Sequence, residues 1–125
     1  MTLPVSVRNA GDTGNLTGVT AIAVGGSNTC ALLTGGTVQC WGDNSYGQLG
    51  NNSTNLSKLP VSVRNASNTE DLLNATAVAA SLAHTCATVN TGGGQIQCWG
   101  RNIYVQLGNG ALFMSNVPIP VVGIP

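Results

Sequence analysis

Residues 30–51 read CALLTGGTVQCWGDNSYGQLGN, and residues 86–109 repeat them as CATVNTGGGQIQCWGRNIYVQLGN. The two copies lie 56 positions apart at their first cysteine and 58 apart from the second cysteine onward, because the glycine stretch between them is longer in the second copy. Length changes of this kind are tolerated at the tip of a turn between two strands. The segment is therefore predicted to be a β-hairpin that the chain contains twice.

The repetition extends beyond the hairpin. LPVSVRNA occurs at 3–10 and again at 59–66, and VPIPVV at 117–122 opens a partial third copy with a proline at the corresponding place. The chain is accordingly divided into a first repeat at 1–58 and a second at 59–116. Residues 117–125 are interpreted as the start of a third repeat or as an exchangeable terminal strand.

Each repeat contains four short segments that are typical of strands, rich in β-branched and small apolar residues and separated by turns. The proline-led PVSV segment suits an edge strand or a first strand, where a missing N–H does no harm. Only 68–76 is a candidate for a single helical turn. The predicted fold is all-β, with two four-stranded antiparallel sheets and one strand left over at a terminus. The predicted strands are 4–7, 19–24, 29–33 and 37–41, and then 60–63, 75–80, 85–89 and 95–99.

The cysteine spacing agrees with this hairpin. If Cys30 faces Cys40, the glycine turn between them becomes a three-residue loop. The same arrangement pairs Cys86 with Cys98 and places 91–93 at the second tip. Directly opposed strand residues lie about 4.5 to 5.5 Å apart at Cα, which a disulfide can bridge.

Two intra-hairpin disulfides are therefore favoured, while four buried free cysteines acting as small apolar residues remain an alternative. A zinc site is a third interpretation, but zinc favours cysteines separated by about two residues, together with further Cys or His ligands. This chain has four cysteines at wide spacing and one histidine. If the disulfides form, the protein works outside the reducing cytosol, at an extracellular or cell-surface location.

Composition excludes several classes of partner. Hydrophobic residues make up 42% of the chain, charged residues only 6%, and the formal net charge is zero. The four cations Arg8, Lys58, Arg64 and Arg101 are scattered, so no basic patch for nucleic acid is expected. No run of 18 apolar residues occurs, so membrane insertion is not expected. So few charges predict a surface that is either polar and neutral or covered by other protein.

The residues that carry catalytic chemistry are sparse. His84 is the single histidine and occupies a position that the repeat explains structurally, and the acids Asp12, Asp43, Glu70 and Asp71 form no triad with it. The glycine runs lack the lysine and helix of a phosphate-binding loop. We expect no enzyme activity, no cofactor and no metal site. The two tryptophans are interpreted as packing residues between sheets in preference to a sugar or peptide site.

The stretch CWGDNSYGQLGN and its copy closely resemble the repeat of the regulator of chromosome condensation family. In the first repeat the matching residues are Leu32, Gly36, Trp41, Gly42, Asn44, Gly47, Gln48, Leu49 and Gly50. In the second they are His84, Thr85, Trp99, Gly100, Asn102, Gln106, Leu107 and Gly108. The chain departs from the family pattern where Asn28 replaces the family histidine, where Ser81 stands in the place of Gly25, and where Val105 stands in the place of Gly47.

The resemblance implies that each repeat is one blade of a β-propeller, a small sheet that packs on neighbouring blades through both faces. Family members that act as exchange factors or as a β-lactamase inhibitor close seven blades into a ring, whereas this chain has two. Two blades leave one apolar face open at each end, and such faces find partners. We expect a non-enzymatic module that associates with copies of itself, through blade faces or a donated strand, into a ring or filament. The alternative is a piece of a longer propeller that binds or inhibits another protein.

Overall fold

The computed structural model describes residues 3–91, 93–111 and 113–122, and every regular element within them is a β-strand. The described residues contain no helix, and so none that is long and apolar enough to cross a membrane. Gly92, at the predicted hairpin tip, and 123–125, at the end of the predicted third copy, lie outside the described residues. The strands are β1 (Val19–Val24), β2 (Asn28–Leu33), β3 (Val38–Gly42), β4 (Ser57–Ser62), β5 (Ala75–Ala80), β6 (His84–Val89), β7 (Gln95–Gly100) and β8 (Ser115–Pro120).

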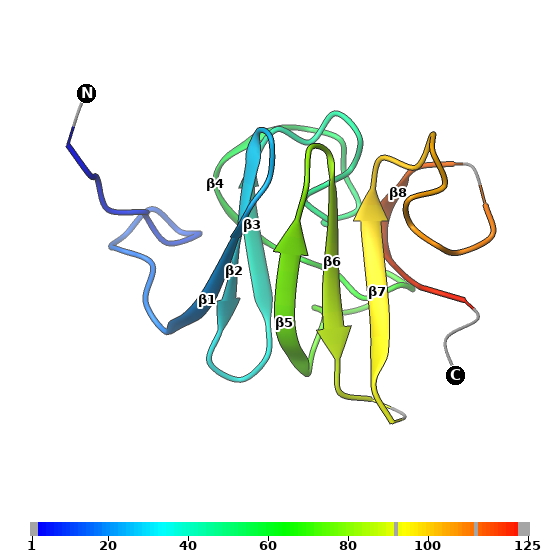
Figure 1. Ribbon diagram of the computed structural model, residues 1–125. Coiled ribbons are helices and arrows are strands. Elements are labelled where there is room, and N and C mark those ends of the chain that lie inside the picture. Colours follow the sequence, from blue (N-terminus) through cyan, green and yellow to red (C-terminus); the bar gives the residue numbers. More distant parts are fainter. Residues whose placement is uncertain (1–2, 92, 112, 123–125) are drawn as a thin grey trace.

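The strands form two antiparallel four-stranded sheets in the orders β1-β2-β3-β4 and β5-β6-β7-β8, which confirms the all-β prediction of two blades. The β1–β2 and β5–β6 turns lie at one end of the sheets and the β2–β3 and β6–β7 turns at the other (Figure 1). We call the first end the upper rim. It also carries the loops 43–56 and 101–114, which begin where β3 and β7 end.

The predicted hairpin register is confirmed in both blades. Cys30 is paired with Cys40 and Cys86 with Cys98, directly opposite each other across neighbouring strands. Disulfides join both pairs. The two-residue insertion in the second copy is taken up entirely beyond the pairing, at the turn, so it leaves the sheet unchanged.

The position of the proline-led strand differs from the prediction. The copies at 57–62 and 115–120 are the fourth, outermost strands of the sheets, β4 and β8, and not the first strands of the repeats that follow them. An outer strand suits proline, because one side of it has no neighbour that needs an N–H donor. The predicted boundaries after 58 and 116 therefore fall inside β4 and β8.

Residues 117–120 are consequently not the start of a third blade, and the interpretation of a left-over C-terminal strand is wrong for them, because they complete the second sheet. The left-over copy is the N-terminal one. Among the described residues, 3–7 belong to no sheet, and their nearest regular pairing is the isolated bridge between Arg8 and Asn15. The predicted helical turn at 68–76 is also absent. Asp71 forms a bridge with Arg64 there, and β5 begins at Ala75.

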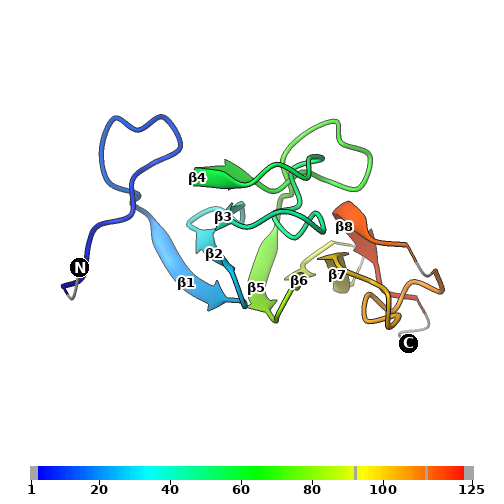
Figure 2. The ribbon, with the colours of Figure 1, turned by 90° about the horizontal axis from the view of Figure 1, so that it is seen from above.

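The hydrophobic core lies between the two sheets. Strand β5 contacts both β1 and β2 of the first blade, and the view from above shows the sheets side by side (Figure 2). The buried side chains come from the first blade, including its loop 43–56, from one face of the second sheet and from the connection between the blades. They are Cys30, Leu32, Val38, Cys40 and Leu49, then Ala75, Ala87, Val89 and Trp99, and then Val63 and Leu72.

Candidate interaction surfaces

A tryptophan of the second blade is buried against the first blade. Trp99 is fully buried, and its Nε1 donates a hydrogen bond of 2.9 Å to the main-chain oxygen of Gln48. Thr85 Oγ1 donates to the same oxygen at 3.1 Å. Gly50 leaves space for the indole, because a Cβ at this position would lie 2.7 Å from Nε1 of Trp99. The motif glycine and glutamine of one blade thus form the slot that receives the motif tryptophan of the next.

The motif asparagines hold the upper-rim loops in place. The Asn44 side chain is fully buried. Its Oδ1 accepts a hydrogen bond from the Leu49 N–H, and its Nδ2 donates to Asn51, Ser53 and Asn55. In the second blade Asn102 makes the equivalent contacts with Leu107, Asn109, Ala111 and Phe113. These buried amides are structural, since they satisfy the main chain of irregular loops that have no sheet partner.

Two further motif positions are explained by the main chain. Gly42 and Gly100 have φ angles of +109° and +104°, and a Cβ there would lie 2.4 Å and 2.5 Å from the oxygens of Ser27 and Ala83. Only glycine satisfies both restrictions.

The glutamines shape the same loops. Gln48 accepts a hydrogen bond from the Tyr46 N–H and donates to Asp43, while Gln106 accepts one from the Tyr104 N–H. Burial raises the pKa of Asp43, but hydrogen bonds from Ser45, the Asn44 main chain and Gln48 outweigh it and lower the pKa below 3.8. Asp43 is therefore ionised at neutral pH and structurally engaged.

His84 lies at the start of β6, opposite Gly100. Burial disfavours its charged form and lowers its pKa below 6.5, so the imidazole is neutral at pH 7. Among the described residues, no group of three or more His, Cys, Asp or Glu side chains is arranged to hold a metal ion. Of the predicted site residues, Trp99, Gln48 and Gly50 thus meet between the blades, and the structure brings none of the predicted residues into an acid–base arrangement.

The first blade presents an open face on the side away from the second. We call it the first open face, and it surrounds a hollow of about 520 Å³. Ile22 is 65% exposed there, and Val7 and Val19 are each 40% exposed. Leu16 and Trp41 complete its apolar lining.

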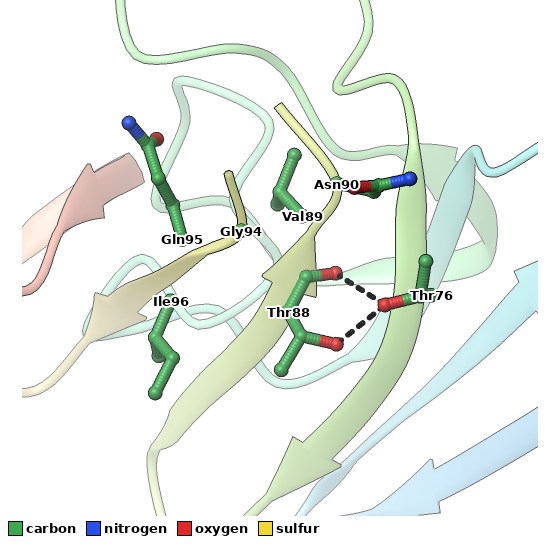
Figure 3. A pocket seen from close by; sticks show the side chains of 7 residues that line it. All are labelled: Thr76, Thr88, Val89, Asn90, Gly94, Gln95 and Ile96. Carbon is green, nitrogen blue, oxygen red and sulfur yellow. Dashed lines mark hydrogen bonds between the residues drawn. The ribbon is translucent and has the colours of Figure 1, made fainter. Parts of the chain in front are cut away.

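The second blade has the opposite face open. This second open face carries Cys86, Thr88 and Ile96 and contains two shallow hollows of about 220 and 250 Å³. In the larger hollow Thr76 lies beside Thr88 with a hydroxyl–hydroxyl distance of 2.8 Å, and Ile96 lies on the neighbouring strand (Figure 3). Asn90 and Gln95 also line the larger hollow.

The residues of the two open faces are repeat copies of residues that are buried between the blades. On the first open face Val7, Leu16, Val19, Ala31 and Trp41 correspond to Val63, Leu72, Ala75, Ala87 and Trp99 of the core. On the second, Cys86, Thr88 and Ile96 correspond to Cys30, Leu32 and Val38, whereas Cys98 and Leu107, the copies of Cys40 and Leu49, are themselves buried. The open faces are thus the two halves of one interface type, presented at opposite ends of the chain.

Comparison with known proteins agrees with this architecture. Two family models described as regulator of chromosome condensation (RCC1) repeat match the chain, one at residues 19–48 and the other at residues 35–88. The chain belongs to the RCC1 repeat family. The first match covers β1 to β3 with the motif loop, and the second runs from the first hairpin turn into β6.

Relatives of the RCC1-repeat chain are much longer. It is 32% identical over 90 residues to the mitochondrial RCC1 domain-containing protein RUG3 of Arabidopsis thaliana, which covers 72% of this chain and 19% of RUG3. The crystal structure of human WBSCR16 superposes with a TM-score of 0.73 and 25% identity, over 94% of this chain and 28% of that one. Prp20p of Saccharomyces cerevisiae, a protein characterised for binding to Gsp1p and histones, superposes at 0.68 with 19% identity. The alignment with Prp20p covers 91% of this chain and 28% of Prp20p. The chain therefore spans between 19% and 28% of the length of these relatives.

Sequence reasoning missed two features of the site. One is the buried Thr85 hydroxyl that shares the Gln48 oxygen with Trp99, which a threonine on a strand does not reveal. The other is the side chain of Arg101, which lies over the rings of Tyr46 and Tyr104. The first repeat has Asp43 in the place of Arg101, so the repeat pattern hides this position.

Proposed function

We propose that the RCC1-repeat chain is a non-enzymatic structural and interaction module that associates head to tail with copies of itself into a ring or filament. The observation that carries the proposal is the match between its open faces. Each is a repeat copy of one half of the buried contact between the blades. The first open face of one copy would therefore cover the second open face of the next.

The contact would bring polar as well as apolar groups together. Placed like Trp99, Trp41 of one copy would donate its indole N–H to the main-chain oxygen of Gln106 in the next, the counterpart of Gln48. Full burial of one exposed Val or Ile stabilises by about 1.5 to 3 kcal/mol. Such side chains include Ile22, Val19, Val7 and Ile96. Association costs on the order of 4 to 15 kcal/mol, so several of these side chains must be buried together before the contact between copies is stable.

The contact between copies would differ from the contact between blades at the upper rim. Between the blades, a Cβ on Gly25 would lie 2.4 Å from Ser81 O, and a Cβ on Gly47 would lie 2.7 Å from Asn116 Cα. On the second open face these two positions are Ser81 and Val105, which have side chains. A docking copy must therefore sit further away at this rim, and the angle between copies would exceed the angle between blades.

The N-terminal segment supports a second mode of association. Residues 3–7 repeat the sequence of β4 and β8 but have no sheet partner among the described residues, and Leu3 and Val5 are 75% and 72% exposed. In an assembly this segment could replace β8 of a neighbouring copy at the edge of β7. Such donor-strand exchange uses the main-chain hydrogen bonds that any edge strand offers.

Two point variants test the face-to-face contact. Ile22→Lys places a charge on the first open face and Ile96→Lys places one on the second, and both side chains are exposed, at 65% and 37%. We expect each variant alone to be monomeric in light scattering, while the unmodified chain forms larger species. Mixed together they should form a dimer and nothing larger, because each retains one intact face.

Other outcomes of the same experiment would contradict the proposal. A monomeric unmodified chain at 100 μM, or amorphous aggregate in negative-stain microscopy, would refute assembly by this contact. It would support the second candidate function, in which further repeats of a longer chain cover both faces and the rims bind or inhibit another protein. The lengths of RUG3 and WBSCR16 favour that candidate.

The disulfides support an extracellular or cell-surface location as part of this proposal, because such bonds persist in oxidising compartments. Trapping free thiols with iodoacetamide in intact cells, followed by mass spectrometry, tests this. We expect none of the four cysteines to be alkylated before reduction. Complete alkylation would place the chain in a reducing compartment.

A further inference from the structure

Arg101 lies on the upper rim between two aromatic rings, one from each blade. Its guanidinium carbon is 5.1 Å from the centre of the Tyr46 ring and 5.6 Å from the centre of the Tyr104 ring. Cations at this distance are attracted by the negative faces of the rings. The two tyrosines thus fix the orientation of the guanidinium without using its hydrogen-bond donors.

The other two arginines are already neutralised by carboxylates. Arg8 is 3.0 Å from Asp12, and Arg64 is 3.0 Å from Asp71. For Arg101 the structure gives no carboxylate partner within the described ranges, and its Nε is buried without a hydrogen-bond partner. A buried donor without an acceptor costs free energy, which an incoming acceptor would recover.

The corresponding residue of the first blade, Asp43, does not lack hydrogen-bond partners. Asp43 accepts hydrogen bonds from Ser45 and from the side chain of Gln48. Loop geometry therefore does not require an arginine here, since the first blade forms the same loop with an acid. Arg101 introduces a positive charge that contacts two aromatic rings but no carboxylate within the described ranges.

The surroundings of Arg101 are those of a protein-binding hot spot. The next residues of the same loop include Ile103, Tyr104 and Val105, which are 53%, 75% and 52% exposed. Arginine and tyrosine flanked by apolar side chains are the residue types that carry most of the affinity in protein–protein contacts. A nucleic acid would demand several clustered cations, whereas the four of this chain are scattered and its net charge is zero.

We propose that Arg101, held between Tyr46 and Tyr104, binds an aspartate or glutamate side chain of a partner protein, whose neighbouring apolar residues contact Ile103 and Val105. The planar guanidinium offers a carboxylate two parallel donors. Tyr104 is 75% exposed, so it can rotate to admit the carboxylate. Binding at this site does not require self-association, although Val105 also lies at the upper rim of the second open face.

Peptide selection tests the proposal on the full chain. A phage-displayed library of random nonapeptides is selected in parallel on the unmodified chain and on Arg101→Gln. Arg8→Gln serves as a control with the same change of net charge, at an arginine that is already paired. Far-UV circular dichroism checks the fold of each variant, and Arg101→Lys and Tyr104→Ala provide second variants that keep the charge or keep the arginine.

We expect Asp or Glu next to apolar residues in the peptides that bind the unmodified chain and the Arg8→Gln variant. Changing that acid to its amide, or Arg101 to Gln, should weaken binding at least tenfold, and Arg101→Lys or Tyr104→Ala should weaken it three- to tenfold. Equal frequencies of acidic residues on the unmodified chain and Arg101→Gln would overturn the proposal. So would tighter Arg101-dependent binding of inorganic phosphate than of the acidic peptides. Loss of self-association in Arg101→Gln would also overturn it, because Arg101 would then be a contact of the assembly.

Discussion

Replacing Trp99 by phenylalanine tests whether the contact between the blades holds the structure together. The change removes the hydrogen bond to the Gln48 oxygen and part of a fully buried ring. A hydrogen bond contributes about 1 kcal/mol net. The lost apolar volume costs about 0.8 kcal/mol for each buried carbon group. We therefore expect the free energy of unfolding to fall by about 2.5 kcal/mol in total.

Trp41→Phe is the matched control, because Trp41 is the repeat counterpart on the first open face and is only half-buried. In the monomeric background of Ile96→Lys, Trp41→Phe should cost less than about 1 kcal/mol. Urea unfolding followed by far-UV circular dichroism measures both. Equal costs for the two variants would refute the reasoning, since the buried contact between blades would then contribute nothing beyond the sheet itself.

A double-mutant cycle extends the same prediction. Thr85→Val alone leaves the Gln48 oxygen with the donor of Trp99, and Trp99→Phe alone leaves it with the donor of Thr85. Both together leave a buried acceptor without any donor, which costs a further 1 to 3 kcal/mol or so. We expect the double variant to lose more than the sum of the single variants. Additive losses would mean that the oxygen finds another partner.

Three further predictions concern the conformation of two glycines, the protonation of His84 and the reduction of the disulfides. Gly50→Ala should destabilise by more than about 2 kcal/mol, because φ is +69° and the added Cβ meets the Trp99 ring. Gly110→Ala, with φ +77° and no atom within 4 Å, should cost only the strain of about 1 kcal/mol, as thermal unfolding will measure. Burial lowers the pKa of His84 below 6.5, so between this lowered pKa and pH 6.5 the folded state binds fewer protons than the unfolded chain. The free energy of unfolding should fall as the pH drops below 6.5. The fall should be smaller in His84→Asn, which has no imidazole to protonate. An unchanged pH profile of the unfolding midpoint would contradict it. Dithiothreitol should reduce Cys86–Cys98 before Cys30–Cys40, since Cys86 is half-exposed whereas both members of the other pair are fully buried. Alkylation and peptide mapping measure the order, and the reverse order would contradict the assignment of open and covered faces.

The pattern of the sequence was sufficient for the hairpins and their register. Cys30 and Cys40 could be placed opposite each other because the numbers of paired residues in a hairpin add to a constant, and the same constant placed the glycine turn. The second repeat then supplied an independent check, since its insertion falls at the turn and leaves Cys86 opposite Cys98. Local information and repetition agree in this region, which is why the prediction held.

The sequence did not show in the same way where each blade begins and ends. A strand such as PVSV pairs with whichever neighbour offers a free edge, and no local signal distinguishes the first strand of one blade from the last strand of the previous one. The structure assigns 57–62 to the edge of β3, which lies before it in the chain. Self-alignment gives the period of a repeat, whereas the starting point depends on pairing between segments separated by the loop 43–56.

The sequence alone also did not show that equivalent motif residues have different structural roles in the two blades. Trp41 and Trp99 look equivalent in the alignment, yet one is half-buried on an open face and the other is fully buried between the blades. The difference arises from position in the array, because the second blade has a neighbour on the side of its tryptophan and the first has none among the described residues. The repeat sequence thus determines which residues each blade face presents. The number of blades determines which faces are left without a neighbouring blade.

The most informative differences between the two copies are at positions where the fold does not require a particular residue. Gly50 and Gly108 agree in both copies because the loop needs a positive φ, and Asn44 and Asn102 agree because each organises such a loop. Asp43 and Arg101 disagree in charge although the loops that contain them are built alike. A side chain that the fold does not constrain, yet that is held between two aromatic rings with an unpaired donor, is better explained by an external partner than by stability. In the proposed assembly the faces of the blades would form the contact between copies, and the unmatched positions of the rim are where a specific partner would be recognised.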